Sequence, residues 1–150
     1  MPTIQIQTKI RAPIELCFDL ARDIDLHVAS MKSSGERAVA GVTSGLISLG
    51  EEVTWEAVHF GVSQRLTSRI TAFDRPRNFR DSQVRGAFRR FDHDHLFEQH
   101  SGVTTMTDIF DYTAPMGLIG RLADTLFLQR YMSRILTERA GIIRDTAESR

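Results

Sequence analysis

The stretch Thr3–Met31, TIQIQTKIRAPIELCFDLARDIDLHVASM, decides how the fold begins. Apolar and polar residues alternate from Thr3 to Ala12, which is typical of a half-buried β-strand. Pro13 follows at a position that the first turn of a helix tolerates. Two short helices are indicated by residues at helical spacing: Ile14, Cys17, Phe18 and Ala21 for the first, and Ile24, His27, Val28 and Met31 for the second. We expect Asp23 or Asp25 to cap the second helix.

The segment from Glu36 to Ala114 has the pattern of strands joined by tight turns. Breaks that contain glycine or proline divide it into about six strands, near residues 35–42, 50–59, 62–73, 77–85, 88–98 and 103–113. Because the connections are short, we expect neighbouring strands to be antiparallel. After Pro115, residues 117 to about 147 carry apolar residues at helical spacing without a proline. The predicted order of elements is β-α-α-β6-α.

The apolar stripe of this C-terminal helix changes direction along its length. At about 100° per residue, its first part places Leu118, Ile119, Leu122 and Leu126 on one face. Its second part places a further set of apolar residues on a clearly different face of the helix: Tyr131, Met132, Ile135, Leu136, Ile142 and Ile143. Either the helix bends near Phe127, or its first part covers something different from its second.

Four stretches carry a resemblance to a known family: IRAPIELCFDLARDIDLHVASM (residues 10–31), GEEVTWEAVHFG (50–61), GAFRRFDHDHLFE (86–98) and TTMTDIFDYTAPMGLIGRLAD (104–124). With the order of elements, they resemble the helix-grip fold of the SRPBCC superfamily, which includes START domains, birch-pollen-allergen relatives and polyketide cyclases. The chain looks most similar, over essentially its whole length, to the bacterial members described only as ligand-binding. The resemblance implies an α+β fold in which a curved seven-stranded antiparallel sheet grips a long C-terminal helix around a ligand cavity. It implies no particular reaction, because the superfamily shares a cavity and not a catalytic motif.

Composition limits the class of protein. The chain has 150 residues, which we treat as a single domain, 1–150. Its 19 basic and 19 acidic residues cancel, which disfavours a general electrostatic binder of nucleic acid or membranes. We interpret the arginine-rich stretch 75–90 as a solvated outer face. Since there is neither an apolar run of about 18 residues nor a signal-peptide pattern, we expect a cytoplasmic protein without a membrane span. The single cysteine, Cys17, cannot form an internal disulfide.

The positions of the hairpin turns predict which residues face the inner side of the sheet. A two-residue turn at Phe60-Gly61 pairs one strand with the next as follows: His59 with Val62, Ala57 with Gln64, Trp55 with Leu66, and Val53 with Ser68. These residues are mostly apolar, so we expect them to face inward.

A four-residue loop from Gln99 to Gly102 predicts the pairing of the last two strands: Phe97 with Thr104, His95 with Met106, His93 with Asp108, and Phe91 with Phe110. On the preceding strand the inward set is Phe79, Asp81 and Gln83, because the other set contains Arg80. An odd-length loop around Ala87 then places Asp81 opposite His93, and Phe79 opposite His95. We therefore expect His93 to lie between two carboxylates, Asp81 and Asp108, on the concave side of the sheet.

The predicted inward face carries several polar residues, among them Asp81, Gln83, His93, His95, Asp108 and Tyr112. An ordinary core does not place so many polar residues on its buried face, since each unpaired buried polar group costs about 1–3 kcal/mol. An apolar face with a polar band is typical of a small-molecule pocket. The leading hypothesis is a protein that binds a hydrophobic or aromatic small molecule, such as a lipid or polyketide-like metabolite, between the sheet and the C-terminal helix. The loop at 41–50 and the second helix would frame the entrance. The predicted ligand-binding residues are His27, Met31, Trp55, His59, Gln83, Phe91, His93, His95, Met106, Asp108, Phe110, Tyr112, Leu122 and Leu126.

Two alternatives stay open. The first is a cyclase- or dehydratase-like enzyme in which His93 is the general base and Asp81 or Asp108 orients it. The second is a protein-interaction or homodimer surface formed by apolar residues of the C-terminal helix that are left off the core. His93 and His95 with the two aspartates also have the composition of a metal site, since adjacent inward positions on a strand lie about 6.6–6.8 Å apart. This spacing is common by chance, so we expect no metal. We also expect no cofactor and, because the charges of the chain cancel, no nucleic-acid partner.

Overall fold

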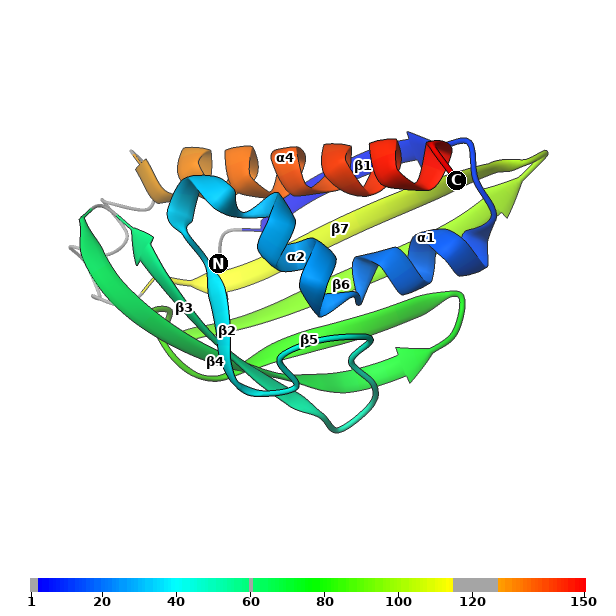
Figure 1. Ribbon diagram of the computed structural model, residues 1–150. Helices are drawn as coiled ribbons and strands as arrows, with labels where there is room; N and C mark the ends of the chain where they lie inside the picture. The colour runs from blue at the N-terminus through cyan, green and yellow to red at the C-terminus, as the bar shows by residue number, and fades with distance from the viewer. Residues whose placement is uncertain (1–2, 60, 115–126) are drawn as a thin grey trace.

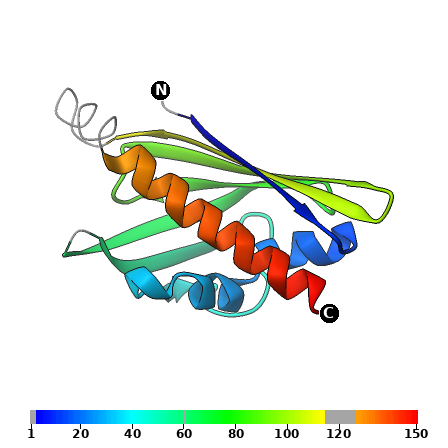
Figure 2. The same ribbon diagram turned by 90° about the horizontal axis from the view of Figure 1, so that it is seen from above.

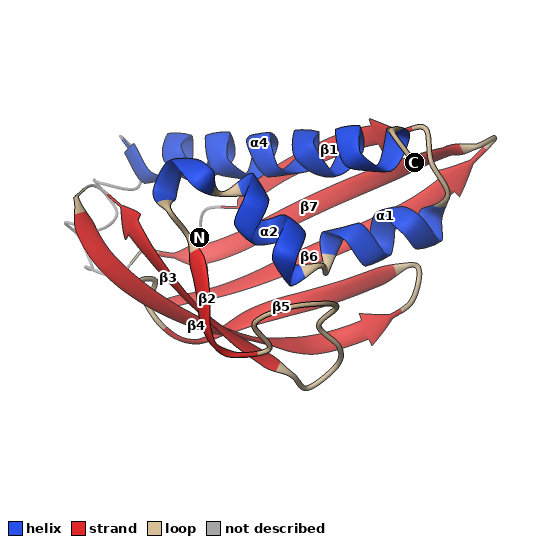
Figure 3. Ribbon diagram, viewed as in Figure 1, coloured by secondary structure: helices blue, strands red, loops and turns tan. Residues whose placement is uncertain are grey.

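A curved sheet of seven antiparallel strands and a long C-terminal helix make up most of the fold (Figures 1 and 3). The computed structural model describes residues 3–59, 61–114 and 127–150. In chain order its elements are β1 (Thr3–Ile10), α1 (Ile14–Ala21), α2 (Ile24–Ser30), η1 (Lys32–Ser34), β2 (Arg37–Gly41), β3 (Glu52–His59), β4 (Val62–Asp74), β5 (Asn78–Arg85), β6 (Arg90–His100), β7 (Val103–Thr113) and α4 (Gln129–Glu148). The strand order β1-β7-β6-β5-β4-β3-β2 confirms the predicted helix-grip architecture.

The helices cover the inner face of the sheet. α4 packs against β1, α1 and α2, and α1 also contacts β6 and β7. Figure 2 shows α4 between β1 on one side and α2 on the other. The Asp23 side chain accepts a hydrogen bond from the Leu26 amide, so Asp23, and not Asp25, is the N-cap of α2.

One end of the space between sheet and helices is a solid core. Phe18 of α1 is fully buried and packs edge-on against Phe73, Phe79 and Phe97, with ring centroids 5.2–5.4 Å apart. Each such aromatic pair adds about 0.5–1.5 kcal/mol beyond the area that it buries. The free volume of the fold consequently lies toward the other end, between α2, the first half of α4 and the β3–β4 arm.

Two of the three predicted strand registers are confirmed, and one is wrong by two residues. The β3–β4 pairs match the prediction from His59↔Val62 onward, and β5–β6 pairs Asp81 with His93 as expected. Between β6 and β7, the structure pairs His95 with Asp108 instead of with Met106, because the turn holds two residues and not four. Ser101 and Gly102 both have positive φ (51° and 78°), as the mirror-image turns of two-residue hairpins require. Since the shift is two residues, each side chain keeps its predicted face.

The C-terminal helix is described from Gln129 onward. The predicted first part of this helix, with Leu122 and Leu126, falls among residues 115–126 and lies outside the described residues. Over the described part, the predicted second stripe points inward: Tyr131, Met132, Ile135, Leu136 and Ile143 are buried or half-buried. Ile142 is the exception, at 39% exposed. The described part of α4 thus presents a mostly polar outer face, and the homodimer alternative stays an untested prediction.

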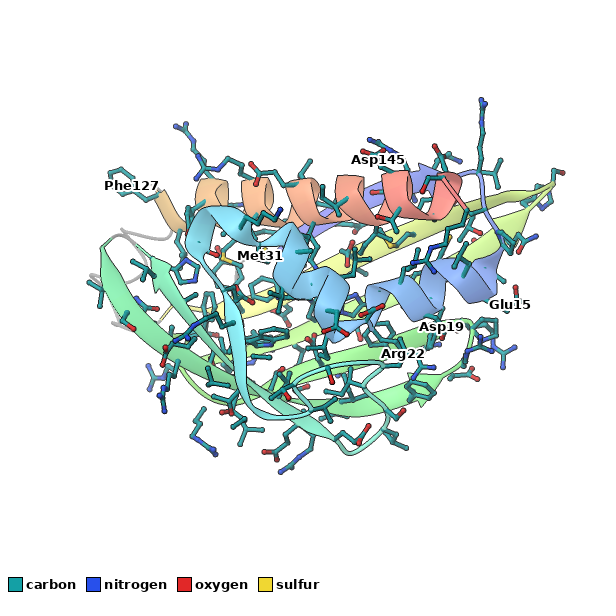
Figure 4. All side chains as sticks on the ribbon, in the orientation of Figure 1. Glu15, Asp19, Arg22, Met31, Phe127 and Asp145 are labelled. Carbon is teal, nitrogen blue, oxygen red and sulfur yellow. The ribbon has the colours of Figure 1, made fainter. Side chains whose placement is uncertain are left out.

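The arginine-rich stretch is largely paired with carboxylates on the outer surface. Arg75 pairs with Asp19, Arg80 with Asp94, and Arg90 with both Asp92 and Asp111. Asp19 also accepts from Arg22 on the same side of the molecule; both residues are labelled in Figure 4. Such exposed pairs stabilise the fold by only about 0–1 kcal/mol each. Among the described helices, none combines the length and the hydropathy that crossing a bilayer requires.

Candidate functional site

A cavity of about 410 Å³ lies between the concave face of the sheet and helices α2 and α4. Small-molecule pockets usually have volumes of about 300–1,000 Å³ and mostly apolar walls. Seven side chains of the wall are those of Phe, Tyr or Trp: Trp55, Phe79, Phe88, Phe91, Phe110, Phe127 and Tyr131. Met31 from the end of α2 and Phe127 from the segment before α4, both labelled in Figure 4, belong to the same wall. The cavity therefore has the size and the lining of a site for a small apolar molecule.

A cluster of two histidines and two aspartates lies at the cavity floor, with Asp81, His93 and His95 in the wall and Asp108 behind them. The Nε2 atom of His93 lies 3.0 Å from Oδ1 of Asp108, and Nδ1 of His95 lies 3.2 Å from the same oxygen. On the other side of the two rings, Oδ1 of Asp81 lies 3.6 Å from Nδ1 of His93 and 3.5 Å from Nε2 of His95. The alternation of β5, β6 and β7 brings the four side chains to one face of the sheet.

Burial and mutual charge set the protonation of this cluster. Burial lowers the pKa of His93, and the neighbouring His95 lowers it further, so His93 is neutral near pH 7. Burial also disfavours the charged form of His95, but Asp108 and Asp81 outweigh it and hold the pKa of His95 above its ordinary value. Burial alone would raise the pKa of both carboxyl groups, yet the two histidines hold these pKa values below their usual range. The cluster therefore contains two ionised carboxylates around one neutral and one more basic imidazole.

Hydrogen bonding within the cluster is incomplete. Both ring nitrogens of His95, which is 2% exposed, lack a well-directed hydrogen bond, because the aspartate oxygens near them lie off the direction of an N–H donor. Oδ1 of Asp81 is likewise buried without a hydrogen-bond donor. An unsatisfied buried polar atom costs about 1–3 kcal/mol, and it is unusual in a folded protein.

A second polar group lies where α2, β3 and α4 meet. Nε2 of His27 lies 2.5 Å from Oε1 of Glu36, and the His27 ring stacks on Trp55 with centroids 4.1 Å apart. Burial would raise the pKa of Glu36, but His27 and, more weakly, His59 hold this pKa below its usual value. Nδ1 of His59 lies 2.5 Å from the hydroxyl oxygen of Tyr131, and burial lowers the pKa of His59. All of these residues line the cavity.

Arg139 brings a positive charge to the same cavity from α4. Its side chain is 8% exposed, and its Nη2 donates a hydrogen bond to the carbonyl of Ala21, the last residue of α1. Its Nε is buried without a hydrogen-bond partner. The charge of Arg139 also helps to lower the pKa of Glu36 and that of Asp81.

The structure brings most of the predicted site residues together. Eight of the predicted ligand-binding residues line the cavity: His27, Met31, Trp55, His59, Phe91, His93, His95 and Phe110. Asp81, predicted as a catalytic candidate, lines it too. Leu122 and Leu126 lie outside the described residues.

Four predicted residues face the correct side of the sheet without forming the cavity wall. Asp108 lies behind the two histidines. Met106 is part of the solid core, and Tyr112 packs against Phe88. Gln83 exchanges two hydrogen bonds with the backbone of Phe88 and so fixes the β5–β6 loop. Alternation identifies the inward face, but neighbouring side chains decide which inward residues reach a cavity.

Sequence reasoning missed Glu36, Tyr131 as a polar group, and Arg139. Arg139 had a usable signal, since it falls three residues after Leu136 and four before Ile143, on the apolar stripe of its helix. Glu36 had none, because its contact with His27 depends on how α2 leads into β2. The chemistry available to the whole site is hydrogen bonding to a guest, proton transfer at His93, and binding of a cation among the acceptors of the His–Asp cluster.

Comparison with known proteins bears on the fold alone. No family model matches the chain, and no curated protein matches it. Among solved structures, the protein TTHA0849 from Thermus thermophilus has a TM-score of 0.76 at 20% identity, covering 97% of this chain and 99% of that one. The Zhui aromatase/cyclase from Streptomyces sp. R1128 has a TM-score of 0.77 at 12% identity, covering 98% and 93%. A START superfamily protein from Mycobacterium smegmatis has a TM-score of 0.72 at 11% identity, covering 98% and 97%.

Proposed function

We propose that this chain, which has the helix-grip fold of the SRPBCC superfamily, binds a hydrophobic small molecule that carries one or a few polar groups. The observation that carries the proposal is the cavity of about 410 Å³ with its aromatic and aliphatic wall. Cavities reduce stability by about 24 cal/mol per Å³. A bound molecule restores the lost contacts, so an apolar guest and this cavity stabilise each other.

The polar groups of the wall indicate what the guest carries. The wall carries polar groups at separate places: the His–Asp cluster on the floor, the His27–Glu36 and His59–Tyr131 pairs, and the Nε of Arg139. The rest of the wall is mainly apolar. A molecule with aromatic rings or an alkyl chain and a few oxygen atoms satisfies both requirements. Lipids and polyketide-like metabolites have this chemistry.

Trp55 provides a direct test, because it is the only tryptophan of the chain and lines the cavity. We expect the apolar fluorophore N-phenyl-1-naphthylamine to bind one molecule per chain, with energy transfer from Trp55 to the probe. The variant Trp55→Phe should lose the energy transfer but keep the fluorescence rise on direct excitation of the probe. Native mass spectrometry of protein purified from its own host should show an added small-molecule mass that organic extraction removes. A chain that gives neither saturable probe binding nor a retained small molecule contradicts the proposal.

Acid–base catalysis is a second candidate, favoured by the position of His93 in the cavity wall. Asp108 accepts from Nε2 of His93 and so leaves Nδ1 as the proton acceptor on the opposite side of the ring. A bound molecule would meet this atom beside Asp81. Turnover of polyketide-like model substrates should then fall with His93→Ala and Asp108→Asn, whereas turnover that survives both substitutions removes the enzyme role.

A further inference from the structure

We propose that Asp81, His93 and His95 form a binding site for one divalent first-row transition-metal ion that opens into the cavity. The three side chains come from neighbouring positions of β5 and β6, and they offer two imidazole nitrogens and a carboxylate oxygen, all within 4.8 Å of one another. The inference does not depend on the identity of the small molecule proposed above, and it departs from the absence of a metal expected from the sequence.

The distances in the cluster fit a metal ion. Oδ1 of Asp81 lies 3.6 Å from Nδ1 of His93 and 3.5 Å from Nε2 of His95. Ligand bonds of about 2.0–2.2 Å in a tetrahedral site separate neighbouring donor atoms by roughly 3.4 Å. The two imidazole rings are stacked with centroids 3.9 Å apart, so they must tilt to direct both lone pairs at one ion. The adjacent cavity gives the rings room to do so.

Asp108 lies in the position of a carboxylate that hydrogen-bonds to the histidine ligands of a metal site. It lies 3.0 Å from Nε2 of His93 and 3.2 Å from Nδ1 of His95, which are the ring nitrogens that point away from Asp81. A carboxylate in this position keeps protons on the far nitrogens and lone pairs on the near ones. Both near nitrogens are then acceptors, directed toward the same side as the Asp81 oxygen.

With both imidazoles neutral, three acceptors converge here without a donor and repel one another, and a metal ion would replace the proton that the two aspartates otherwise favour on His95. Oδ1 of Asp81 and Nε2 of His95 are both buried without a hydrogen-bond partner. A single proton relieves only one pair of these atoms, whereas a divalent cation binds all three.

The ligand set selects the class of ion. Two imidazoles and one carboxylate suit zinc, iron, cobalt or nickel ions, whereas magnesium and calcium prefer all-oxygen sites. Three protein ligands leave at least one coordination position free, and here that position faces the cavity. A water molecule or an oxygen atom of a guest would occupy it.

The test titrates untagged, chelator-treated protein with Co²⁺, using calorimetry for stoichiometry and visible absorption for coordination. We expect one ion per chain, with the intense visible bands of a four- or five-coordinate ion. Asp81→Asn and His95→Gln should each weaken binding at least about 100-fold, and Asp108→Asn about 10–100-fold. The matched control is His100→Gln, which removes an exposed histidine from the end of the same strand and should leave binding unchanged.

Thermal unfolding separates loss of metal binding from loss of the fold. The metal-free variants should unfold cooperatively, and Co²⁺ should raise the unfolding temperature of the wild-type chain but not that of Asp81→Asn. The proposal is overturned if the wild-type chain shows no saturable binding, or if binding survives both Asp81→Asn and His95→Gln. Binding that is lost equally with His100→Gln places the ion on the surface and overturns it as well. None of these measurements uses the hydrophobic probe, so the metal site and the ligand cavity can fail independently.

Discussion

Replacing Ala57 with phenylalanine tests the ligand cavity most directly. Ala57 lies on β3, is 6% exposed, and lines the cavity two residues after Trp55. A phenyl ring added there occupies roughly 100 Å³ at protein packing density, which is about a quarter of the cavity volume. Its neighbour Val58 is 53% exposed on the opposite face of the same strand, so Val58→Phe adds a comparable group without entering the cavity.

The expected change in stability follows from the filled volume. At about 24 cal/mol per Å³, filling roughly 100 Å³ stabilises the fold by at most about 2.4 kcal/mol. Overpacking strain takes back about 1–3 kcal/mol where the ring meets the opposite wall. We therefore expect Ala57→Phe to leave the free energy of unfolding about unchanged or to raise it by up to about 1.4 kcal/mol. Val58→Phe should change it by less than about 0.5 kcal/mol.

The expected change in binding has the opposite sign. With a quarter of the space filled, the affinity for N-phenyl-1-naphthylamine should fall at least tenfold, or about 1.4 kcal/mol, in Ala57→Phe and stay the same in Val58→Phe. Urea unfolding and probe titration on the same preparations measure both quantities. If Ala57→Phe destabilises the chain by more than about 2 kcal/mol while probe affinity is unchanged, the side chain does not point into an open volume and the reasoning is wrong.

Two further predictions concern buried polar groups. Thr104→Val should lower the free energy of unfolding by about 1–3 kcal/mol, because the buried Oγ1 of Thr104 donates to the Ala12 carbonyl at 2.7 Å; a change below about 0.5 kcal/mol in urea unfolding contradicts this. Burial lowers the pKa of His59 in the folded chain. Below about pH 6.5, the unfolded chain therefore binds more protons at His59 than the folded chain does. As the pH falls from that value toward the folded pKa, this difference lowers the free energy of unfolding. His59→Asn should therefore lose less stability than wild type between about pH 7.5 and about pH 5.5, and an equal or larger loss refutes the assignment.

Much of the sheet could be predicted because its pattern is local. Alternation along β5 and β6 identified Phe79, Asp81, His93 and His95 as inward, and the structure places all four in the cavity wall. The β6–β7 register failed because two- and four-residue loops over Gln99–Gly102 give the same inward face, and alternation cannot tell them apart. Only the positive φ angles of Ser101 and Gly102 select the shorter turn.

The sequence by itself determined the order of elements, the inner face of the sheet, and the gathering of histidines and aspartates on that face. Each of these depends on periods of two or 3.6 residues, which a linear pattern records. Only the tertiary structure decided that Asp108 also contacts His95 from outside the cavity wall, that Glu36 meets His27, and that Arg139 enters the cavity from α4. Those contacts join elements whose separation in space is set by how the helices pack across the curved sheet. The same packing fills the Phe18 end with side chains and leaves the other end open as a cavity.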